Sequence, residues 1–157
     1  MDLSSLLAII SLAASPISEL RGAIPVAISV YDYPWWQAYL IGVAGNILPV
    51  PFILLLLEFI TGLLSRWTIF DRFFQWIFRV VRRRGEKVSR WHYVGLILFV
   101  AIPLPVTGAW TASILSVLSK FSFWPAFFSI VAGILLAGVI VTVAWSAGWH
   151  LAGLIGV

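Results

Sequence analysis

Long runs without a charged residue dominate the chain. They cover residues 3–18, 33–57, 91–119 and 121–157. A straight membrane-spanning helix needs about 20 apolar residues. The second and fourth runs therefore predict spanning helices over about 34–64 and 122–144, the latter followed by a C-terminal segment to residue 157. Because Asp2 stands where a signal peptide would carry positive charge, the first run is interpreted as a retained membrane segment.

Prolines interrupt the first and third runs near their middles. Proline lacks a backbone donor and clashes with the preceding turn, so a helix entering at Trp91 should break near Pro103. Non-helical backbone persists at membrane depth only inside protein or beside a water-filled cavity. Segments 3–31 and 91–119 are therefore either kinked spans or re-entrant helical hairpins, and their spacing leaves both open. The residues expected to form the breaks are Pro16, Gly22, Pro25, Pro103, Pro105 and Gly108.

An internal similarity suggests two repeats. Residues 36–45 (WQAYLIGVAG) match residues 124–133 (WPAFFSIVAG) at five of ten positions. In both places a proline-broken segment precedes a Trp and a long helix. If each broken segment returns to the side it entered from, each repeat crosses once and the two repeats have opposite orientation, as in many secondary transporters. The chain is then one membrane domain, 1–157, with repeats over 1–64 and 91–157.

Basic residues concentrate between the repeats. Eight of the ten Lys/Arg lie in 66–90, where polar positions recur every three or four residues opposite an aromatic and aliphatic stripe. This pattern predicts an amphipathic helix in the headgroup layer that contacts anionic lipid, and its stripe argues against nucleic acid. The positive-inside rule places it in the cytoplasm, with both termini outside. Its predicted lipid-binding residues are Arg79, Arg82, Arg83 and Arg84.

Composition supports a multi-pass protein of the cell (inner) membrane. Hydrophobic residues make up 62% and charged residues 10%, against about 25% charged residues in soluble domains. The absence of Cys excludes disulfides and thiolate metal sites. With two His and six acidic residues, we expect neither a metal site nor a cofactor. No Gly-x-Ser-x-Gly, His-Glu-x-x-His or phosphate-loop motif is present, so we do not expect an enzyme.

Two charges inside apolar sequence are the strongest site candidates. Ionisable groups within membrane segments usually face a partner or a polar cavity. Glu19 and Arg21 would lie about 200° apart on a helix and pair only in a turn. Alternatively, Ser15 as cap and Pro16 in the first helical position would place Glu19 near a helix N-terminus. The competing interpretation is a buried pair that only fixes the hairpin.

Polar groups elsewhere are weaker candidates. Asn46, with Pro49 and Pro51, predicts a helix kink and an amide at mid-depth; a helix–helix hydrogen bond is the alternative. Thr107 and Thr111 either offer hydroxyls or bond back to their own helix, which we expect of Ser113. Near the cytoplasmic end of its helix, Glu58 is expected to snorkel or to pair with a loop arginine.

Three motifs in this order resemble the bacterial and archaeal small multidrug export protein family. They are residues 16–25 (PISELRGAIP), 45–52 (GNILPVPF) and 99–111 (FVAIPLPVTGAWT). Pro16 to Glu19 also resembles the first re-entrant element of the DedA/VTT membrane proteins, which implies two opposed hairpins and proton-linked translocation of polyprenyl-phosphate lipids. The arginines of their second element are replaced here by Ala101 and Val106, which leaves Arg21 as the cation for a phosphate.

The sequence therefore favours a small, proton-linked secondary transporter. Glu19 would carry the proton and Arg21 would bind an anionic head group, while Asn46, Thr107 and Thr111 complete a mid-depth site. A lone Glu would suit a cationic drug, but the Glu–Arg pair favours a lipid-like or amphiphilic substrate. A scaffold that binds anionic lipid is the alternative, and an ion channel ranks lowest because no ring of repeated polar residues is visible. The chain leaves a homo-oligomer open.

Overall fold

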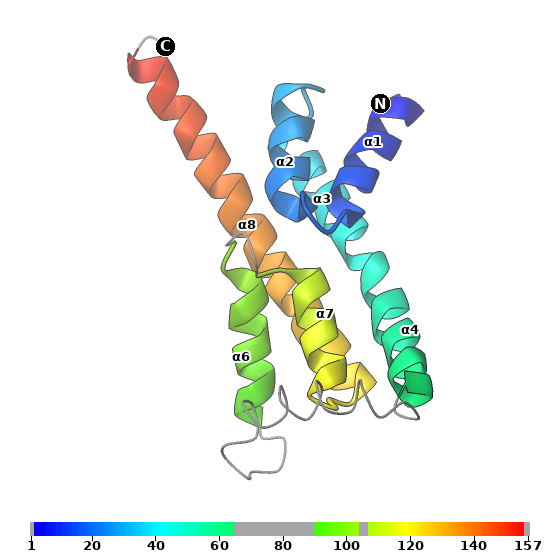
Figure 1. Ribbon diagram of the computed structural model, residues 1–157. Helices are drawn as coiled ribbons and strands as arrows, with labels where there is room; N and C mark the ends of the chain where they lie inside the picture. Colours follow the sequence, from blue (N-terminus) through cyan, green and yellow to red (C-terminus); the bar gives the residue numbers. More distant parts are fainter. Residues whose placement is uncertain (1, 65–89, 104–106, 156–157) are drawn as a thin grey trace.

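The computed structural model describes residues 2–64, 90–103 and 107–155, and within these ranges every regular element is an α-helix (Figure 1). The first half holds α1 (Leu3–Ala14), α2 (Glu19–Ser29), α3 (Trp35–Ile47) and α4 (Pro49–Leu64). The second half holds α6 (Arg90–Ala101), α7 (Ala109–Leu118) and α8 (Phe123–Ile155). The all-helical prediction is confirmed for the described residues.

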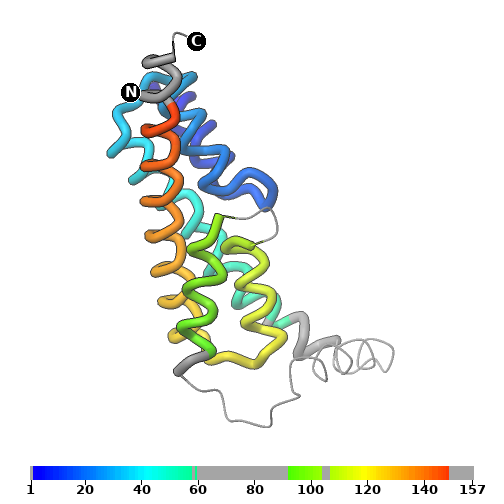
Figure 2. Tube along the Cα trace, turned by 90° about the vertical axis from the view of Figure 1, so that its left-hand side faces the viewer, coloured from blue at the N-terminus to red at the C-terminus, as the bar shows by residue number. Residues whose placement is uncertain are grey.

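The short helices form two pairs that approach each other from opposite ends of the molecule. Helices α1 and α2 run in opposite directions, as do α6 and α7, and the connections of the two pairs lie near mid-height in both views (Figures 1 and 2). The start of α1 and the end of α8 lie at the same end of the molecule. Segments far apart in sequence therefore meet in the middle.

Prolines explain one break fully and the other in part. Helix α6 ends at Ala101, two residues before Pro103, as predicted. Between α1 and α2, the Ser15 hydroxyl accepts a hydrogen bond from the Ser18 N–H at 3.2 Å, which closes a turn containing Pro16. The expectation that Gly22 and Pro25 interrupt this segment is wrong, because both lie inside α2. Packing between α1, α3 and α8 holds α2 helical despite the missing proline donor.

Two stretches among the described residues are long and apolar enough to cross a membrane: Trp35–Leu57 and Phe123–Gly148. The first divides at Leu48, one residue before Pro49, where the sequence predicted a kink. The second belongs to α8, whose 33 residues continue well past residue 144. The predicted end at 144 is therefore wrong. No proline follows Pro125, so nothing in the sequence stops the helix.

Glycines allow each long helix to cross the first helix of its own half. A Cβ on Gly45 of α3 would lie 2.8 Å from Ala13 Cβ and 3.1 Å from Ile10 O in α1. A Cβ on Gly133 of α8 would lie 2.5 Å from Val100 Cβ and 2.8 Å from Ile97 O in α6. These two glycines end the matched ten-residue segments, so the shared sequence serves the same helix crossing in both halves.

Alanine and isoleucine side chains fill much of the core, and several aromatic side chains face outward. Fully buried core residues include Ile9, Ala13, Ala23, Ile24, Ala27, Ala109, Ala112, Ile130 and Ile134. Phe52, Phe59, Trp124 and Val143 are all more than 60% exposed, as expected for side chains in contact with lipid. The predicted basic helix with Arg79, Arg82, Arg83 and Arg84, together with Pro105 and the side chain of Glu58, lies outside the described residues.

Candidate functional site

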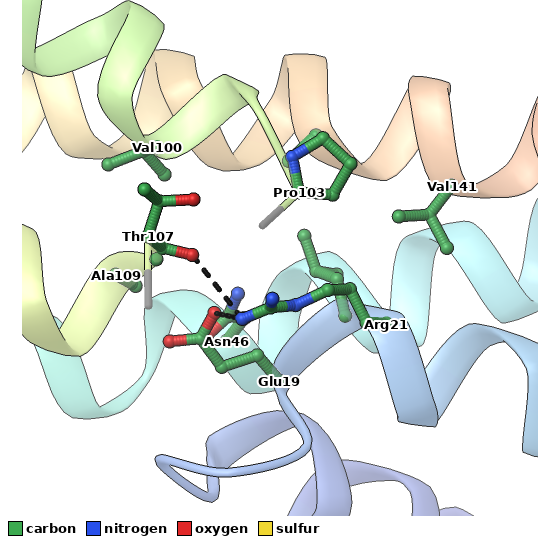
Figure 3. Close-up of a pocket in the computed structure, with 11 residues that line it drawn as sticks. Glu19, Arg21, Asn46, Val100, Pro103, Thr107, Ala109 and Val141 are labelled. Atoms are coloured by element: carbon green, nitrogen blue, oxygen red, sulfur yellow. Dashed lines mark hydrogen bonds and ion pairs between the residues drawn. The ribbon is translucent and has the colours of Figure 1, made fainter. Parts of the chain in front are cut away.

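The two hairpin connections enclose a small polar cavity against α3 and α8 (Figure 3). Its volume is about 10 Å³, which is room for about one water molecule. Polar side chains come from the start of α2, from α3 and from the connection before α7, and apolar ones from α6 and α8. The lining residues are Glu19, Leu20, Arg21, Asn46, Val100, Pro103, Thr107, Gly108, Ala109, Ala137 and Val141.

Glu19 pairs with Arg21 because its backbone is in the left-handed region. Glu19 is the first residue of α2, with φ of 48°. This conformation turns its side chain back, and its Oε2 lies 3.5 Å from Nη2 of Arg21. On a regular helix the two side chains would lie about 200° apart and could not pair, so the left-handed backbone removes this obstacle. The conformation costs a residue other than glycine about 1–2 kcal/mol, and such strain is concentrated at functional sites.

The carboxylate of Glu19 sits at the N-terminus of α7, in the other half of the chain. Its Oε1 lies 3.5 Å from the amide nitrogen of Trp110, and the amide of Ala109 is also directed to it. Free amides at a helix start favour negative charge. A Cβ on Gly108 would overlap this carboxylate. Helix α2 begins at Glu19, so Pro16 lies in the preceding turn and not in the first helical position as predicted. The Ser15 hydroxyl nevertheless accepts the Ser18 N–H, and Glu19 lies at a helix N-terminus as that arrangement predicted.

Arg21 and Trp110 connect the two hairpins. Nη2 of Arg21 donates to the backbone oxygen of Thr107 at 3.3 Å, and its side chain is 25% exposed against 7% for Glu19. The Trp110 indole Nε1 donates to the Ala14 backbone oxygen at 3.0 Å. Both bonds run between segments that are far apart in sequence, so they hold the connections of the two hairpins against each other.

Asn46 carries an unpaired atom into this site. The residue is 2% exposed and lines the cavity from α3. Its Oδ1 has no hydrogen-bond donor among the residues that the structure describes. The alternative role of Asn46, a helix–helix hydrogen bond through this oxygen, is therefore not seen within the described chain.

The threonine hydroxyls bond within their own hairpin. Thr107 Oγ1 donates to Ile102 O at 2.6 Å. The atom of Thr107 that Arg21 contacts is the backbone oxygen and not the hydroxyl. Thr111 Oγ1 accepts the Gly108 N–H at 3.1 Å and is not among the lining atoms. Ser113 donates to Ala109 O at 2.6 Å, which confirms the expected back-bond.

Several residues in and around the cavity were not predicted. Ala137 and Val141 of α8 and Val100 of α6 form apolar walls, and Trp110 supplies an amide and an indole. Trp110 lies two residues after Gly108, within the second break, and not at the end of a spanning segment. This unusual position was the signal in the sequence that Trp110 could belong to the site.

Glu19 and Arg21 are the ionisable groups among the lining residues, so the site is neutral when both are charged. Within the described ranges no cluster of three or more His, Asp or Glu gathers to hold a metal.

Comparison with known proteins identifies the family. Residues 19–140 match the family model described as "Putative small multi-drug export protein". This match covers most of the chain, from Glu19 through the middle of α8. No curated protein and no solved structure matches. The chain therefore belongs to this family and is a membrane protein.

Proposed function

Taking membership of the small multi-drug export family as the premise, we propose that the protein is a proton-linked secondary transporter of lipid-like, anionic amphiphiles. Its halves are inverted repeats, each with a re-entrant hairpin before a long crossing helix. Two observations support this architecture: the hairpins approach from opposite ends (Figure 1), and Gly45 and Gly133 make equivalent crossings. Transporters built in this way bind substrate at mid-depth, where the broken helices meet.

The ion pair between Glu19 and Arg21 carries the proposal. A guanidinium stays protonated in proteins, whereas a carboxyl group can gain or lose a proton. The site therefore changes between net charge zero, with Glu19 ionised, and plus one, with Glu19 protonated. It has no state of net charge minus one. Protonation releases Arg21 and the α7 amides from Glu19, and an anionic head group can then take its place.

This charge alternation favours an anion over a cationic drug. A cation entering the site would meet Arg21 and find only a carboxylate that is already paired. An anion would meet the guanidinium and the helix start, which are common phosphate and carboxylate ligands. The head group of the substrate would bind in the site, while its apolar tail would stay in the bilayer beside the outward-facing apolar side chains. The words "multi-drug export" in the family description would then refer to the export of amphiphilic molecules in general.

Substrate access requires the hairpins to separate. In this structure the cavity has room for about one water molecule. The bonds from Arg21 to Thr107 and from Trp110 to Ala14 close it. Opening them from one side and then the other would expose the same site alternately, while the basic segment 66–90 stays in the cytoplasm against anionic lipid and both termini lie outside. A cavity between the hairpins that contains an acid and a base favours this mechanism over a scaffold.

The test uses purified protein in liposomes with an imposed pH gradient. Movement of a labelled polyprenyl phosphate and of a cationic dye is followed. Glu19→Gln should abolish pH-driven movement of the phosphate lipid while leaving its binding intact. Arg21→Ala should lose binding, and Arg21→Lys should retain part of it because the point charge survives without the planar fork. Asp32→Asn and Lys120→Gln, at exposed positions outside the cavity, are the matched controls.

Stability separates transport from a purely structural pair. If Glu19 and Arg21 only fix the hairpin, each single change strands a charge and costs about 3–5 kcal/mol. The double change Glu19→Gln with Arg21→Met would then restore thermal stability without affecting activity. Well-folded single variants that still move the phosphate lipid would refute the proposal, as would faster movement of the dye than of the lipid.

A further inference from the structure

The cavity contains a buried hydrogen-bond acceptor that no described residue satisfies. Asn46 Oδ1 is buried without a donor among the described residues. The contacts of the Glu19 carboxylate with Arg21 and with the Trp110 amide are both 3.5 Å long, at the limit of hydrogen bonding. Arg21 already donates to Thr107 O. A buried acceptor left unpaired destabilises a folded protein, so this site is complementary to a small hydrogen-bond donor.

The size of the cavity restricts what that donor can be. A volume of about 10 Å³ is the space of one water molecule, and buried waters need at least two polar partners. We propose that one water molecule occupies this cavity and donates one hydrogen to Asn46 Oδ1 and the other to the Glu19 carboxylate. Asn46 is then a positioning residue for the acid, reaching it through the water from α3.

Other small occupants fit the cavity less well. A metal cation would lie beside the guanidinium of Arg21, 3.5 Å from the same carboxylate, and would be repelled. An empty cavity is the usual state of an apolar void, whereas this one has a carboxylate, an amide and a backbone oxygen in its wall. Arg21 is the other ionisable group facing Glu19; the lining from α3, α6, α7 and α8 is uncharged.

The water also gives the proton a route, and this part rests on the proposed function. A hydronium ion reaching the cavity transfers one proton to a Glu19 carboxylate oxygen and remains as neutral water. The new carboxyl O–H then donates to that water, which still donates to Asn46 Oδ1. The acceptor in α3 is satisfied in both protonation states, so the water can stay while the charge of the site changes.

Thermal stability gives a test whose sign is decisive. If Asn46 Oδ1 is simply unpaired, Asn46→Leu removes a buried unpaired acceptor and should leave the melting temperature unchanged or raise it. If the water is present, the change expels it and removes a donor from Glu19, and the melting temperature should fall by about 3 °C or more. Ser116→Ala is the control, because its buried hydroxyl donates to its own helix at Ala112 O, 2.7 Å away. An unchanged or higher value for the Leu variant would overturn the proposal.

A direct measurement decides the matter even if the Leu variant fails to fold. Infrared difference spectra of the reconstituted protein after a pH jump, recorded in H₂¹⁶O and H₂¹⁸O, should show an isotope-sensitive O–H band. This band should persist in Ser116→Ala and disappear in Asn46→Leu. Its absence from the unmodified protein would refute the water site. If the band is present while Glu19→Gln still transports normally, the proposed function fails and the water site stands.

Discussion

Replacing Gly108 by alanine tests the contact between the two halves of the chain. The backbone of Gly108 is extended, with φ of 175° and ψ of −175°, which alanine adopts without strain. The cost is therefore steric. The new Cβ would lie 2.5 Å from Glu19 Cδ, whereas ordinary contacts begin at 3.4 Å. The carboxylate must retreat by roughly 1 Å to restore ordinary van der Waals contact.

That shift should break the contacts of the carboxylate with Arg21 and with the Trp110 amide. The bonds to Arg21 and to the Trp110 amide are already 3.5 Å long, so a retreat of this size takes them out of range. Overpacking costs about 1–3 kcal/mol, and hydrogen bonds to a charged group contribute about 1.5–3 kcal/mol. We expect a loss of about 3 kcal/mol, seen as a fall of about 9 °C in melting temperature.

The assay is thermal unfolding of purified protein with two comparisons. Gly95→Ala in α6 is the control, because its Cβ meets nothing within 4 Å and alanine suits a helix interior. Its melting temperature should stay or rise. In a Glu19→Ala background the obstruction is gone, so Gly108→Ala should add almost no further loss. An equal loss in both backgrounds, or a Gly108→Ala variant as stable as the Gly95→Ala variant, would show that the carboxylate does not pack on Gly108.

Two further predictions concern the hairpin contact and the topology. Trp110→Phe removes the indole donor to Ala14 O and should lower the melting temperature by about 3 °C, whereas Trp124→Phe, at an exposed indole, should not; equal effects would mean that the indole bond contributes nothing. A single cysteine at position 87 in this Cys-free chain should react with an impermeant reagent only from the cytoplasmic side, and cysteines at positions 3 and 155 only from outside. Labelling position 87 from outside would reverse the orientation, and opposite sides for the two ends would contradict inverted repeats.

Local chemistry explains what could be predicted of the fold. The end of α6 before Pro103 follows from the missing donor and the proline ring, and the matched segments that suggested a repeat both end at a glycine of a helix crossing, Gly45 and Gly133. Where prediction failed, neighbouring helices decided the outcome. Pro25 stays inside α2 because α1, α3 and α8 surround that helix. The extension of α8 past residue 144 could not be read from a run that lacks any boundary signal.

The candidate site was predicted as a set of residues but not as an arrangement. Glu19, Arg21 and Asn46 are polar groups in apolar sequence, so their inclusion follows from the cost of burying them. Their geometry depends on contacts about 90 residues apart, such as Glu19 with the Trp110 amide. Glu19 also has a left-handed backbone where it meets this second hairpin, and no local sequence pattern predicted it. The hydroxyls of Thr107 and Thr111 have local partners instead.

In the proposed function, a proton on Glu19 would act on both halves of the molecule. Its backbone belongs to the first hairpin, while two of its partners are amides of the second. When the carboxylate is ionised, it attracts both Arg21 and the start of α7, which favours contact between the hairpins. Protonation removes both attractions, and the left-handed strain at Glu19 then favours rearrangement. The event that frees Arg21 for an anion would therefore also weaken the contact that closes the site. A protein with one acid and one base in its cavity can couple proton binding to opening in this way without a second charged pair.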